Sequence, residues 1–188
     1  MYENNFADYE VKELSTKFAG DESATRMGCV GTMNTEMETK TVTKSCEGVV
    51  VKKRTRGTGS GTITLNAHAK HSILSKMLGM VLDSLKDGVY AYGSNSRHEE
   101  FCLTAKVLDE DGNVKYVAYP KVQSETGYVK NIENGAEEVA QGEYTLSVMP
   151  DEHGNGVYEM LETEFTDATA KEQWLNNWSY DLVRVAQS

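Results

Sequence analysis

The chain has 188 residues, of which 39% are hydrophobic and 26% are charged, a composition that can bury a core and is unlike that of a disordered chain. Its 29 acidic and 19 basic residues give a net charge of -10, which argues against a general nucleic-acid-binding protein. No apolar run approaches the roughly 18 residues of a membrane span, and the acidic first ten residues lack the apolar core of a secretion signal.

Strands are expected to dominate the first third of the chain. Residues 1–10 are interpreted as an N-terminal arm. Thr-rich segments near 11–18 and 27–43 alternate loosely, as half-exposed strands do. In residues 62–69 apolar side chains alternate strictly with polar ones, which predicts a strand with one buried face.

A long basic hairpin is predicted over residues 44–64. Residues 41–71 contain six basic residues and one acidic residue, whereas both flanking parts of the chain are acidic overall. The glycine-rich segment 57–61 is expected to form the turn at the tip of this hairpin. A basic hairpin on an acidic body favours head-to-tail contact between copies of the chain. The residues expected to contact another subunit are Lys52, Lys53, Arg54, Arg56, Gly57, Gly59 and Gly61.

One amphipathic helix is predicted at residues 72–86. Apolar residues recur there at steps of three and four, from Ile73 to Leu85, and form a wide stripe that needs a sheet or a second helix to cover it. Ser72 would cap the start of the helix, and Asp87-Gly88 would end it.

Two more hairpins are predicted in the second half. Residues 100–119 alternate on both sides of a polar turn at 109–113. A second hairpin is expected to run from Glu143–Met149 through a turn rich in glycine and back along Val157–Phe165.

The C-terminal segment, residues 166–188, is expected to hold a short helix near Ala168–Asn177 that Asp167 caps. We therefore predict that residues 1–188 form a single domain. The expected fold is mainly β (α+β): a β-sandwich or partly open barrel with one packed central α-helix, a long hairpin arm and a short C-terminal helix.

Residues that could carry chemistry do not form a recognisable motif. Segment 57–61 lacks the lysine-serine ending and the following helix of a phosphate loop, and the basic run has no interleaved aromatic residues for binding nucleic acid. His68, His71 and His98 lack the spacing of a zinc site. No cysteine lies in a nucleophile motif, and three widely spaced cysteines predict reduced thiols. We expect no catalytic residues, no metal and no cofactor.

The order of these elements resembles a known family. Two stretches carry the resemblance: Gly57–Gly93, which reads GTGSGTITLNAHAKHSILSKMLGMVLDSLKDGVYAYG, and Phe101–Val122, with its FCLTAKVLDEDGN hairpin followed by YPKV. The chain resembles the major tail proteins, or tail tube proteins, of long-tailed bacteriophages, particularly those that infect Gram-positive bacteria.

The resemblance implies a β-sandwich flanked by a helix that forms hexameric rings, and rings that stack into a tube through which the genome passes into the host. The hairpin around Glu47–Gly61 and the terminal arms would contact a neighbouring subunit or the next ring. The implied partners are other copies of the chain and the tape measure, tail terminator and distal tail proteins, with DNA passing unbound and no membrane. The implied location is the virion, after assembly in the host cytoplasm.

Three alternatives stay open. Related tubes serve contractile tails, tailocins and secretion machines. A monomeric β-sandwich could instead bind a host receptor or another virion protein, and a small barrel hydrolase could use histidine and glutamate residues. The excess of acid favours the tube, because a negative lumen repels DNA phosphates instead of retaining them.

Overall fold

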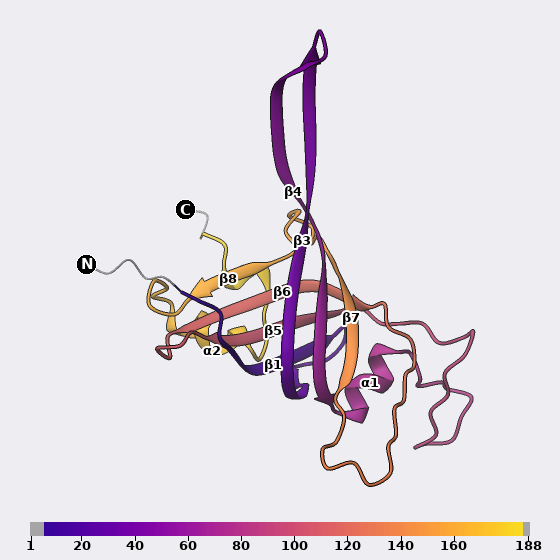
Figure 1. Ribbon diagram of the computed structural model, residues 1–188. Coiled ribbons are helices and arrows are strands. Elements are labelled where there is room, and N and C mark those ends of the chain that lie inside the picture. Colours follow the sequence, from indigo (N-terminus) through magenta and orange to yellow (C-terminus); the bar gives the residue numbers. More distant parts are fainter. Residues whose placement is uncertain (1–5, 186–188) are drawn as a thin grey trace.

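The computed structural model describes residues 6–185, so the outer ends of the N-terminal arm and of the C-terminal segment lie outside the described residues. These residues are mostly antiparallel β, with two short α-helices (Figure 1). Its strands follow the order β2-β1-β5-β6-β7-β4-β3, with β8 beside β6. This open sheet fits a partly open β-sandwich, as the alternation predicted. The strands are β1 (Glu10–Phe18), β2 (Thr25–Arg26), β3 (Gly28–Cys46), β4 (Val49–Ala69), β5 (Phe101–Leu108), β6 (Val114–Ser124), β7 (Gly142–Met149) and β8 (Tyr158–Leu161).

The two faces of the sheet bury separate hydrophobic clusters. In β6, Val117 and Tyr119 point into the main core, which α1 (His71–Met77) helps to close. Tyr116 and Ala118 point to the opposite face, where α2 (Ala168–Trp174) covers them with the fully buried Trp174. Alternation along one strand therefore supplies both clusters.

The predicted helix at 72–86 is wrong in its length and in its cap. The helix α1 has only seven residues, and Lys70, with no side-chain hydrogen bond, occupies the N-cap position that Ser72 was expected to hold. Beyond the helix the apolar periodicity no longer matches burial, because Val81 is 60% exposed.

Gly79 ends α1 eight residues before the predicted stop. Its φ is +60°, its N–H donates to the carbonyl of Lys76 at 3.0 Å, and the N–H of Met80 donates to the carbonyl of Ser75 at 2.8 Å. These two bonds form a Schellman motif, which uses a left-handed residue to close a helix. A Cβ at position 79 would lie 2.0 Å from the carbonyl oxygen of Arg97, so this position needs glycine for space as well.

The long hairpin is larger than predicted, and its tip is elsewhere. Strands β3 and β4 pair from Gly28 and Ala69 out to Cys46 and Val49. The turn is Glu47-Gly48, where both residues have positive φ values (51° and 79°), as a two-residue hairpin turn requires. Segment 57–61, expected at the tip, lies inside β4 instead.

The hairpin predicted at 100–119 is confirmed by β5 and β6, which pair from Leu108 and Val114 to Leu103 and Tyr119 and, past a bulge, at Phe101 and Val122. The hairpin predicted from β7 to β8 is wrong: both strands pair with β6, end to end along the same edge. β8 pairs with residues 115–118 and β7 with residues 121–124, and Pro120 lies where one partner gives way to the other. Proline has no N–H for a sheet ladder, so it suits this break in the pairing.

The short C-terminal helix is confirmed, although α2 ends at Trp174 and not near residue 177. The carboxylate of Asp167 accepts hydrogen bonds from the N–H groups of Thr169 and Ala170, as the sequence predicted for an N-cap.

Candidate interaction surfaces

A two-stranded arm projects from the sheet. We define the arm as residues 39–57, the outer halves of β3 and β4 with their turn, and every residue from 38 to 58 is exposed (Figure 1). An isolated pair of strands is at best marginally stable in water, because it has no core of its own. The arm therefore lacks the burial that holds the rest of the sheet together.

The two faces of the arm differ in chemistry. The strand register places residues 40, 42 and 44 on one face with their partners 56, 54 and 52, because side chains alternate between faces. The other face carries mostly threonines, with Thr41 and Thr55 hydrogen-bonded at 2.8 Å. We call the first the basic face, and its charged residues are Lys40, Lys44, Lys52, Arg54 and Arg56.

Like charges oppose each other across the basic face. Lys40 lies opposite Arg56, and Lys44 lies opposite Lys52. Like charges directly across a strand pair are destabilising. None of the arm's basic side chains makes an ion pair within residues 6–185. An acidic partner surface would relieve this repulsion, so the arm is suited to ordering against such a surface.

The glycines predicted to contact another subunit lie at the base of the arm. Gly59 has a φ of +80°, and a Cβ there would meet the carbonyl oxygen of Gly154 at 2.6 Å and the ring of Pro150 at 2.9 Å. Gly61 is buried in the sheet, and Gly57 is exposed. Gly59 lets β4 pass close to the turn between β7 and β8, so this residue helps to position the arm. The four predicted basic residues, in contrast, are all on the arm itself.

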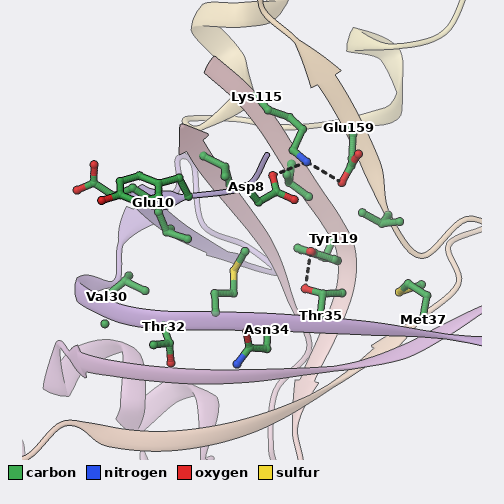
Figure 2. A pocket seen from close by; sticks show the side chains of 17 residues that line it. Asp8, Glu10, Val30, Thr32, Asn34, Thr35, Met37, Lys115, Tyr119 and Glu159 are labelled. Carbon is green, nitrogen blue, oxygen red and sulfur yellow. Dashed lines mark hydrogen bonds and ion pairs between the residues drawn. The ribbon is translucent and has the colours of Figure 1, made fainter. Parts of the chain in front are cut away.

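A groove of about 750 Å³ lies on the open side of the sheet (Figure 2). Strand β3 runs beside β1 there without pairing to it, and the groove separates them. Lys115, which lines the groove, is 9% exposed; its Nζ lies 2.5 Å from a carboxylate oxygen of Asp8 and 3.7 Å from one of Glu159. The hydroxyls of Thr35 and Tyr119 lie 2.7 Å apart across the groove.

The chemistry of the groove suits binding of an extended segment. Burial raises the pKa of Tyr119, so its hydroxyl stays protonated at neutral pH. The β3 edge that faces the groove has no strand partner within residues 6–185, so its N–H and C=O groups can pair with an added strand. Sequence reasoning missed Asp8, Lys115 and Glu159, because only the fold brings these distant positions together.

The histidines weighed as zinc ligands do not converge. His68 and His71 are both exposed, and His71 packs edge-on against Tyr90 at 4.5 Å between ring centres. His98 hydrogen-bonds the carbonyl of Ser124 through Nδ1 at 2.7 Å. Within residues 6–185, no group of three or more histidine, cysteine or acidic side chains is placed to hold a metal ion.

The three cysteines are unpaired thiols, as their spacing predicted. Cys29 and Cys46 are exposed, and Cys46 stands beside the turn at the tip of the arm. Burial raises the pKa of Cys102 to about 12, against the opposing effect of the positive charge of Lys17. Because the thiolate is the nucleophile, the Cys102 thiol is inert at neutral pH.

In the part of the chain that the structure describes, no helix has both the length and the apolar character needed to cross a bilayer. No protein-family model matches the chain, and no curated protein matches it either.

Proposed function

We propose that this chain is a structural subunit that assembles with copies of itself into stacked rings and so forms the tail tube of a long-tailed bacteriophage. The arm is the main support for this proposal. It is fully exposed and places like charges opposite each other, so it would be stabilised by contact with another surface. Two parts of the proposal, the hexameric ring and the passage of the genome, come from the family resemblance.

The open sheet supports the same function. An unpaired strand edge is a liability in a monomer, and joining sheets from neighbouring subunits into a closed ring covers such edges. The edge of β3 beside the groove is of this kind. The subunit would act without catalysis, metal or cofactor, and its further partners would be the tape measure, tail terminator and distal tail proteins.

The net charge of -10 supports a lumen that DNA can slide through. Negative walls repel phosphates, whereas basic walls would hold them by releasing counterions. A tube structure with a lysine-lined channel would contradict this part of the proposal.

The deciding experiment is negative-stain microscopy of the tag-free full chain, with size-exclusion chromatography at rising concentration. We expect rings and stacked tubes. The matched variant replaces residues 39–57 with Asn-Gly, which keeps the packed base of the arm and closes β3 onto β4. It should keep the wild-type circular dichroism spectrum but form no tubes. A wild-type chain that remains a monomer at every concentration would refute the proposal.

The groove favours a second candidate function. An extended segment of a host receptor or of another virion protein could add to the free edge of β3, as in other strand-addition complexes. This binding module would work as a monomer and without the arm, so the same experiment separates the two functions. Tubes of contractile tails, tailocins and secretion machines share the assembly and would be distinguished by their parent particle.

A further inference from the structure

Two long loops lie at the end of the molecule opposite the arm (Figure 1). One comprises residues 78–100, between α1 and β5, and the other residues 125–141, between β6 and β7. The ring centres of Tyr92 and Tyr128 lie 6.1 Å apart, and Tyr92 and His98 are hydrogen-bonded at 3.1 Å. The loops therefore form one surface, which we call the loop end.

The loop end is acidic. Its two loops contain eight acidic and three basic residues, a net charge of -5. The arm contains six basic residues and one acidic residue, a net charge of +5. Within residues 6–185, none of the loop-end acids makes an ion pair, so their charge is available to a partner.

The loop end also exposes apolar and aromatic side chains. The most exposed is Val139, at 82%. Tyrosines are frequent anchors in protein interfaces, and Lys and Arg side chains stack favourably on their rings. The basic face of the arm supplies such cations around the exposed Val42. The exposed loop-end residues of this type are Val81, Leu85, Val89, Tyr90, Tyr92, Tyr128, Val129, Ile132 and Val139.

We propose that the loop end of one copy receives the basic face of the arm of the next copy. This inference rests on the proposed self-assembly and names its contact surfaces. The two surfaces differ and lie at opposite ends, so each contact leaves a free arm and a free loop end. Such a head-to-tail contact propagates along an axis and produces stacking.

The groove is a less suitable receiver for the arm. Two of its carboxylates, those of Asp8 and Glu159, already form ion pairs with Lys115. The groove also lies beside β3, the strand from which the arm extends, and not at the opposite end of the molecule.

Cysteine cross-linking in assembled tubes tests the contact, because Cys46 at the arm tip is a natural reporter. In a Cys29→Ser background, Val129→Cys, Ile132→Cys and Val139→Cys each place one thiol on the loop end. Glu10→Cys places one at the groove as a matched control. After mild copper-phenanthroline oxidation of tubes, a non-reducing gel should show a ladder of linked chains for at least one loop-end variant. Adding Cys46→Ser should abolish the ladder.

The outcomes separate the two proposals. Tubes that give a ladder only with Glu10→Cys, or with no variant, overturn the loop-end contact and leave self-assembly intact. A parent chain that forms no tubes overturns both.

Charge exchange gives a second, independent measurement. Glu137→Lys with Glu138→Lys should stop tube formation, and so should Lys52→Glu with Arg54→Glu. All four substitutions in one chain should restore tubes, because residues 52 and 54 of the arm and residues 137 and 138 of the loop end are then again opposite in charge. A folded four-fold variant that fails to assemble would contradict the pairing, whereas loss of folding would appear in its circular dichroism spectrum.

Discussion

Gly59 and Gly156 touch backbone to backbone where the arm joins the body: a Cβ on Gly156 would lie only 2.0 Å from the carbonyl oxygen of Gly59. Strand β4 thus rests on the turn between β7 and β8, and this contact sets the direction of the arm. Gly59, which the sequence places in an apparent glycine-rich loop, is therefore part of a tightly packed junction.

Gly59→Ala should destabilise the protein. Its φ of +80° alone should cost alanine about 1–2 kcal/mol, and the contact with the Gly154 carbonyl adds to this. For a chain of this size the melting temperature should fall by about 2–4 °C per kcal/mol. Gly57→Ala is the matched control, because a Cβ there meets no atom within 4 Å. Equal melting temperatures for the two variants would contradict the close backbone packing at Gly59.

Lys52→Glu should order the free arm while weakening assembly. It replaces the repulsion of Lys44 by attraction, and cross-strand pairs of this kind contribute about 0.2–1 kcal/mol. Hydrogen exchange of residues 39–57 should slow in the monomer, and the concentration needed for tubes should rise.

Lys53→Glu is the control for that experiment. It makes the same change in net charge on the threonine face, opposite Thr43. It should leave arm exchange nearly unchanged and affect tubes less. If both variants have the same effect, arm order and tube formation depend on the total charge of the arm and not on which face carries it.

Tube formation should slow as salt rises. Exposed charges more than about 10 Å apart are largely screened at 0.1 M ionic strength, and the arm and the loop end carry opposite charges that would guide docking. Light scattering at 50 mM and 500 mM NaCl should show the faster growth at low salt. If the rate of tube growth does not depend on salt, charge attraction does not guide the docking of one copy onto the next.

Cys102 should resist alkylation in the native protein. With iodoacetamide at pH 8, mass spectrometry should find two adducts, on Cys29 and Cys46, and a third only after unfolding. The folded pKa of Cys102, about 12, exceeds the value of 9.0 expected for a free thiol. Above pH 9 the unfolded chain therefore loses this proton first, so stability should fall as pH rises from 9 towards 12. Rapid labelling of all three thiols in the native protein would contradict the burial of Cys102.

Local patterns predicted the strands well and failed where a single backbone contact decides the structure. Alternation identified the buried face of 62–69, and the Asp167 cap was evident because it depends on neighbouring residues. The apolar stripe of 72–86 overestimated the helix, since the left-handed Gly79 ends it, packed against the backbone of Arg97, a contact that periodicity does not encode.

The candidate site was predictable in its charge but not in its geometry. The basic residues of the arm are where the sequence placed them. Its turn was missed because Glu47 is an unusual residue at positive φ, whereas the glycines at 57–61 offered a stronger turn signal. The groove and the loop end join segments far apart in the chain, so only the sheet order reveals them.

Strands β3 and β4 each run unbroken from the core to the arm tip, with a bulge between Met37 and Thr39 at the base of the arm. A force applied at the tip is therefore carried straight into the seven residue pairs that bind β4 to β7. Those pairs are loaded in shear, the direction in which many hydrogen bonds resist together. An assembly bent sideways would transmit the load from copy to copy through its sheets, and behave as a stiff rod.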